Sequence, residues 1–183
     1  MKKIFILRHA EKPDGANQGV DITGKQDPDS LIPQGWQRAG ALATFFSGKG
    51  TLPAPDAIYA ASDEKEKLGH HDKDGSNSKR PMETVTPLAA KLGQTLITKY
   101  TKGQETELAA EVVGLSGVTA ICWQHESIPQ IAIAITGSSN GIPNPWPGDR
   151  FDVVWCLEST GTTWAFSQVC QELLAGDKTT PIS

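Results

Sequence analysis

Short apolar runs alternate along the chain with stretches whose apolar residues recur at helical spacing. Runs rich in branched and aromatic residues predict buried strands at 4–7, 56–61 and 118–123. Apolar residues three and four positions apart predict helices at 36–46, 80–92, 105–114 and 128–135. Two further apolar runs, joined by a short polar turn, predict a hairpin of strands at 151–157 and 162–169.

The order of these elements defines a fold class. Strand and helix alternate three times, which predicts a largely parallel sheet covered by helices on both faces. The terminal hairpin makes the sheet mixed, so we expect an α/β three-layer sandwich. A short edge strand is expected at 96–100, and the tail from Gly176 is expected to fray.

The chain of 183 residues suits a single domain spanning 1–183 with a full core. A polar stretch at about 63–79 interrupts the pattern and predicts a surface insertion. It holds a group of potential metal ligands, His70, His71, Asp72 and Asp74. Four such close neighbours in a loop rarely form a fixed coordination shell, so we expect no metal site.

The composition of the chain limits the kinds of binding partner that it can have. The formal net charge is -4, and 38% of residues are hydrophobic and 21% charged, which is typical of a soluble globular protein that does not bind nucleic acid. No apolar run has the length of a membrane span or of a signal-peptide core, so we expect a cytoplasmic protein without a membrane partner. The odd set Cys122, Cys156 and Cys170 predicts packed, reduced thiols.

Charged and imidazole side chains follow the predicted strands. Arg8 and His9 end the first strand, and His125 follows the third, while Arg80 opens a helix. Taken alone, Arg8 and His9 could end a strand and point into water; if the strands are parallel neighbours, all four groups meet at one crevice. Guanidinium groups suit phosphoryl oxygens, and a neutral imidazole can attack phosphorus while a second one donates a hydrogen bond. The set predicts phosphoryl transfer without a metal.

Three ordered motifs give this chain a family resemblance. They are LRHAEKP at 7–13, SKRPMETVTPLA at 78–89 and WQHESIP at 123–129. With the segments 58–62 and 147–152, they resemble small bacterial members of the histidine phosphatase superfamily, also called the phosphoglycerate mutase-like family. The resemblance covers nearly the whole chain.

The resemblance implies a metal-independent phosphatase that needs no cofactor and hydrolyses a phosphomonoester, as a phosphoric monoester hydrolase of the histidine acid phosphatase type. His9 would form the phosphohistidine, Arg8 and Arg80 would bind the phosphate, and His125 would hydrogen-bond it. The substrate would be a phosphorylated small molecule or a phosphoprotein. Two departures stand out: Ala10 replaces the family's usual glycine, and the insertion precedes Arg80.

Several carboxylates compete for the role of proton donor. Glu126 follows the second histidine, as an acidic residue does in the phytase-like branch of the family, and is the first candidate. Glu105 and Glu107 lie near where the mutase-like branch carries its acid, and Glu11 follows the nucleophile. Each has a structural alternative, since Glu11 could orient an arginine, and Glu105 and Glu107 could stabilise a helix dipole.

Other functions stay open at this level. One is a catalytically weak phosphate- or phosphoprotein-binding regulatory module, and another is a phosphohistidine-protein phosphatase; a mutase is less expected. Trp123 and Trp146 could line a pocket for a ring, although core packing is the commoner use of tryptophan.

Overall fold

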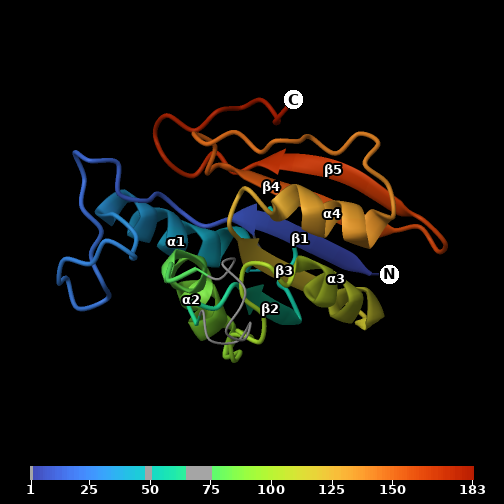
Figure 1. Ribbon diagram of the computed structural model, residues 1–183, viewed down its shortest axis with the longest axis horizontal. Coiled ribbons are helices and arrows are strands. Elements are labelled where there is room, and N and C mark those ends of the chain that lie inside the picture. The colour runs from blue at the N-terminus through green and yellow to red at the C-terminus, as the bar shows by residue number, and fades with distance from the viewer. Residues whose placement is uncertain (1, 48–50, 65–75) are drawn as a thin grey trace.

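The computed structural model describes residues 2–47, 51–64 and 76–183, in which five strands form one sheet in the order β2-β3-β1-β4-β5 (Figure 1). The strands are β1 Lys3–Arg8, β2 Ala57–Ala60, β3 Val118–Trp123, β4 Val153–Ser159 and β5 Trp164–Cys170. β1, β2 and β3 are parallel, and β4 and β5 complete the sheet as an antiparallel hairpin. The predicted mixed, mostly parallel sheet is confirmed.

Four helices cover the two faces of this sheet (Figure 1). They are α1 Pro33–Phe45, α2 Arg80–Leu92, α3 Glu105–Gly114 and α4 Ile128–Thr136. Leu42 of α1 and Leu88 of α2 pack with Phe5 and Leu7 on one face. On the other face the core is formed by α3 and α4 against the alternate residues of β1 and β3. The three-layer α/β sandwich predicted from the sequence is therefore confirmed.

Local sequence explains where the helices begin and end. A proline lies in the first turn of α1, α2 and α4, where its missing N–H removes no helical hydrogen bond. Gly93 ends α2 in the left-handed conformation, with φ of 65°, and its N–H donates to the carbonyl of Ala90. Pro87 lies inside α2 and does not end it. The helix has the predicted bounds.

Some predicted elements differ in the structure. α1 begins at Pro33, three residues before the predicted start, because proline is favoured in a first helical turn. The expected strand at 96–100 is reduced to isolated bridges, Tyr59 with Ile97 and Ser62 with Thr101. Both hairpin strands begin two residues later than predicted, and they end two and one residues later, respectively.

The C-terminal tail is packed rather than frayed, which corrects the prediction from Gly176 onward. The carboxylate of Asp177 accepts hydrogen bonds from Arg38 and from the backbone of Leu173 and Leu174. Ile182 is only 4% exposed, and its backbone bonds to Gln168. These contacts hold the tail against α1, through Arg38, and against β5, through Gln168.

His70, His71, Asp72 and Asp74 lie outside the described residues, and within those residues no three potential ligands are grouped to hold a metal. Cys122, Cys156 and Cys170 are free thiols, the first two buried. In the described part of the chain, no helix has the length and apolar character needed to cross a membrane.

Candidate active site

The topology brings the carboxyl ends of β1 and β3 together. These strands are parallel neighbours, with Arg8 opposite Trp123, and the pairing continues one step further because the N–H of His9 donates to the carbonyl of Trp123 at 3.0 Å. Arg8 and His9 therefore lie beside the segment that carries His125. Ligands of open α/β sheets bind beyond this edge.

His9 is a buried, neutral imidazole. Its Nδ1 lies 2.7 Å from the carbonyl oxygen of Ala10, which can only accept, so Nδ1 carries the proton and Nε2 keeps its lone pair. The side chain is 3% exposed, and burial lowers its pKa to about 3, with further lowering by the charge of Arg8. Arg80 and His125 lower the same pKa, so both act electrostatically on His9.

A loop binds one side of the Arg8 guanidinium and leaves its other donors without partners among the described residues. Its Nη1 donates to the carbonyls of Gly148 at 2.8 Å and Arg150 at 3.1 Å, and its guanidinium lies 3.8 Å from the ring centre of Phe151. Its Nε and Nη2 are buried and have no hydrogen-bond partner among the described residues. Burial lowers the Arg8 pKa to about 10, so it stays charged at neutral pH. Such unpaired cationic donors indicate an anion site.

Arg80 reaches the same region from the first turn of α2. Its Nη1 donates to the carbonyl of Pro28 at 3.1 Å, while its buried Nε has no partner in the described part of the chain. The Thr84 hydroxyl donates to the Arg80 carbonyl at 2.7 Å and accepts from the N–H of Ala10 at 2.8 Å. Thr84 thus ties the segment after His9 to the turn that carries Arg80.

His125 and Glu126 form a pair at the third strand end. His125 Nδ1 lies 2.9 Å from Glu126 Oε2, an ion-pair distance, although the alignment is not that of a hydrogen bond. The Glu126 carboxylate is about half exposed and lies 3.3 Å from Lys102 Nζ. Its contact with His125 holds the pKa of Glu126 well below the usual range, so the carboxylate is ionised at neutral pH.

The other candidate carboxylates are engaged elsewhere or exposed. Glu105 accepts hydrogen bonds from the Trp123 indole at 2.9 Å and from the N–H of Gly103. Glu107 is exposed on α3, and Glu11 is paired with Arg38 at 2.7 Å. Of the four candidates, Glu126 is the one for which the described contacts include a histidine of the predicted site.

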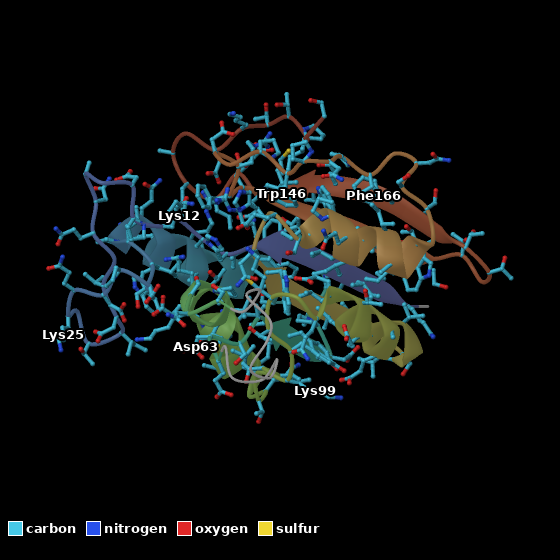
Figure 2. All side chains as sticks on the ribbon, in the orientation of Figure 1. Lys12, Lys25, Asp63, Lys99, Trp146 and Phe166 are labelled. Atoms are coloured by element: carbon cyan, nitrogen blue, oxygen red, sulfur yellow. The ribbon has the colours of Figure 1, made fainter. Side chains whose placement is uncertain are left out.

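The structure adds residues that the sequence analysis did not single out. Thr84 has a sequence signal, because it lies one helical turn after Arg80 within a buried stripe. Phe151 lies in the 147–152 segment of the family resemblance, but its sequence position does not mark it as a neighbour of Arg8. Trp146 is labelled in Figure 2 beside α4. Its ring centre lies 4.8 Å from that of Trp155, and its indole N–H donates to the Arg150 carbonyl. Trp146 and Trp123 are both fully buried, so they serve as core rather than as pocket walls.

The fold is shared with solved phosphatases. SixA, a protein histidine phosphatase solved with tungstate, is 12% identical over 92% of this chain and 97% of its own, with a TM-score of 0.57. A histidine-to-alanine mutant of phosphoserine phosphatase from Entamoeba histolytica, solved with phosphoserine, is 13% identical over 95% and 100%, with a TM-score of 0.58. A mycobacterial glucosyl-3-phosphoglycerate phosphatase is 12% identical over 91% and 98%, with a TM-score of 0.58.

No protein-family model and no curated protein sequence matches the chain. At identities this low, the structural likeness defines the fold. The architecture is the phosphoglycerate mutase-like α/β fold that the sequence motifs imply.

Proposed function

We propose that this protein is a phosphatase that hydrolyses phosphomonoesters through a phosphohistidine on His9. The observation that carries the proposal is the state of His9, a neutral imidazole with its Nδ1 proton bonded to Ala10 and its Nε2 lone pair free. The charges of Arg8 and Arg80 act on it, and both arginines have buried N–H groups without partners among the described residues.

In the first step, the Nε2 lone pair of His9 attacks phosphorus and the bond to the leaving oxygen breaks. The leaving oxygen departs as an alcohol with a proton passed on by Glu126, the proposed general acid. Because this carboxylate is ionised in the free protein, it first takes that proton from the phosphate monoanion of the bound substrate. In the second step, water attacks phosphorus, the P–N bond breaks and its electron pair returns to Nε2. Glu126 takes up the water proton, and inorganic phosphate leaves.

The proposed roles of the cationic groups follow from charge. Arg8 and Arg80 bind the phosphoryl oxygens and stabilise the charge that develops in transfer, and His125 donates a hydrogen bond to them. These donors perform the work that a metal ion performs in other phosphatases. We therefore assign the chain to the histidine acid phosphatase type, acting without cofactor on a phosphorylated small molecule or phosphoprotein.

Hydrolysis of para-nitrophenyl phosphate in excess EDTA tests the proposal. Wild type should turn over, and His9→Ala should lose at least about 10³-fold in kcat, because the nucleophile is gone. Lys12→Ala is the matched control, since Lys12 is exposed three residues further along the chain. Equal turnover by wild type and His9→Ala contradicts the proposal.

The ionised state of Glu126 favours a second candidate function. An ionised carboxylate holds no proton that it could give to a departing alkoxide. The imidazole of a phosphohistidine is a better leaving group than an alkoxide, so its departure depends less on a general acid. A phosphohistidine-protein phosphatase, like the SixA enzymes that share the fold, fits this state. Phosphohistidine peptides hydrolysed at least about tenfold faster, in kcat/KM, than phosphoserine peptides support it.

Tungstate binding without any phosphoenzyme, across both substrate classes, would instead support a phosphate-binding regulatory module.

A further inference from the structure

Gln124 has a buried carboxamide that makes no hydrogen bond to the described residues. It lies between Trp123, the last residue of β3, and His125, and it is only 5% exposed. Neither its Oε1 nor its Nε2 has a hydrogen-bond partner in the described part of the chain. A buried amide that makes no bond costs free energy, so its retention indicates a ligand that supplies the bond.

Strand register places Gln124 beside His9. Arg8 lies opposite Trp123, and the bond from the N–H of His9 to the Trp123 carbonyl extends the pairing by one position, which puts Gln124 opposite His9. Side chains alternate along a strand, and Leu7 and Cys122 belong to the core on the α1–α2 face. Two positions later, His9 and Gln124 are therefore directed to that same face.

The first turn of α2 covers the same end of the sheet. Thr84 bonds to the N–H of Ala10, and Arg80 lies one helical turn before Thr84. Seven described residues carry buried polar side-chain atoms without a partner. Five of the seven belong to this end of the sheet: Arg8, Ser78, Arg80, Gln124 and His125. Such a concentration is expected where one polar ligand is bound by many groups.

We propose that the Gln124 carboxamide is a further ligand of the phosphoryl group, with Nε2 donating to a phosphoryl oxygen beside His9. This inference rests on the proposed function, because it needs a phosphoryl group at Nε2 of His9. Gln124 is neutral, so it adds a hydrogen bond without adding repulsion between Arg8 and Arg80. A lysine at this position would add a third cation to the two arginines.

Calorimetric titration with tungstate, an oxyanion of phosphate shape, tests the inference on the full chain. Gln124→Leu should weaken tungstate binding about tenfold, the effect of losing one hydrogen bond to an anion. Gln124→Glu should weaken it further, because a carboxylate repels the oxyanion. Gln94→Leu is the matched control. The Gln94 amide is half-buried, its Nε2 donates to the carbonyl of Pro55, and its Oε1 has no partner among the described residues, so this substitution should leave the affinity unchanged.

A stability measurement separates a ligand role from a structural one. Without tungstate, Gln124→Leu should have a Tm equal to or above that of wild type, because it removes a buried, unbonded amide. A Gln124 that serves the fold would give a lower Tm and an unchanged tungstate affinity. Gln124→Asn, which keeps the amide but shortens its reach, should bind tungstate less tightly than wild type and fold normally.

The outcomes distinguish this inference from the function on which it rests. If wild type binds tungstate and turns over substrate, but Gln124→Leu and Gln124→Asn bind tungstate as wild type does, the Gln124 inference alone is overturned. If wild type neither binds tungstate nor turns over substrate, both proposals are overturned.

Discussion

The Nδ1 of His9 lies 2.7 Å from the carbonyl oxygen of Ala10, and this contact sets the tautomer of the imidazole. The proton resides on Nδ1, so the lone pair resides on Nε2. Burial and the neighbouring positive charges keep the ring neutral. A neutral nucleophile in a cationic site is the condition that phosphoryl transfer to histidine requires.

His9 should not titrate in the physiological range. Because burial lowers its pKa to about 3, the ring stays neutral between pH 8 and pH 5, while an exposed histidine titrates near 6.5. NMR of protein with labelled histidine rings, assigned by comparison with His9→Gln, checks this. A His9 resonance that shifts with a midpoint near pH 6.5 would contradict it.

The same shift makes stability depend on pH. Between about pH 6.5 and pH 3, the unfolded chain binds a proton at His9 that the folded chain does not, so the free energy of unfolding should fall as the pH drops through this window. Urea unfolding at pH 7 and pH 5 measures the change. His9→Gln should show a smaller loss of stability than wild type over that interval; an equal loss would show that His9 makes no contribution.

Thr84→Val should destabilise the fold by about 1–3 kcal/mol, because it leaves the buried N–H of Ala10 without its acceptor. Turnover should also fall, since Thr84 joins the His9 segment to Arg80. Thr86→Val is the matched control. Its hydroxyl also bonds a carbonyl one turn back, that of Met82, but it is exposed and should change the free energy of unfolding by less than about 0.5 kcal/mol in urea titrations.

Arg38→Met should cost about 3–5 kcal/mol, because the carboxylates of Glu11 and Asp177 would stay buried without their partner. Burial opposes the ionisation of Asp177, but the hydrogen bonds from Arg38 outweigh it and lower its pKa. This stabilisation is therefore present above about pH 4 and is lost as the pH falls through the lowered pKa.

Thermal unfolding at pH 7 checks the Arg38 prediction. Lys178→Met is the control, because it removes the exposed Lys178–Asp149 pair on the same tail and should leave Tm nearly unchanged. Equal changes in Tm for the two substitutions would show that the buried ion pairs of Arg38 stabilise the fold no more than an exposed pair does.

The effect of Glu126→Gln on kcat should depend on the leaving group of the substrate. If Glu126 protonates the departing oxygen, kcat should fall about 10²-fold or more on alkyl phosphates and only a few-fold on para-nitrophenyl phosphate, whose leaving group needs no acid. Glu107→Gln is the control, since Glu107 is exposed on α3. A uniform loss on both substrates would assign Glu126 to the positioning of His125.

The strands and helices could largely be predicted from the sequence, because each is set by local patterns. α2 has its predicted bounds because Pro81 opens it and Gly93 closes it. The convergence of Arg8 and His9 with His125 also followed, because parallel neighbouring strands end at one edge. The family motifs supplied the order of the three segments.

The contacts between distant segments could not be predicted. Asp177 is 139 residues from Arg38, and no local pattern marks them as partners, so the tail was expected to fray. Similarly, the sequence places Glu126 next to His125 but does not reveal that their contact keeps the carboxylate ionised. The burial of Gln124 was not predicted either, because it depends on contacts between distant segments at the end of β3.

Direct detection of the phosphoenzyme is the sharpest test of the account. Wild type mixed with labelled phosphoester in EDTA, quenched in alkali and mapped by mass spectrometry, should carry one phosphoryl group on His9, and His9→Ala should carry none. Turnover with no phosphoryl group on the protein, or with the group on another residue, would contradict the account.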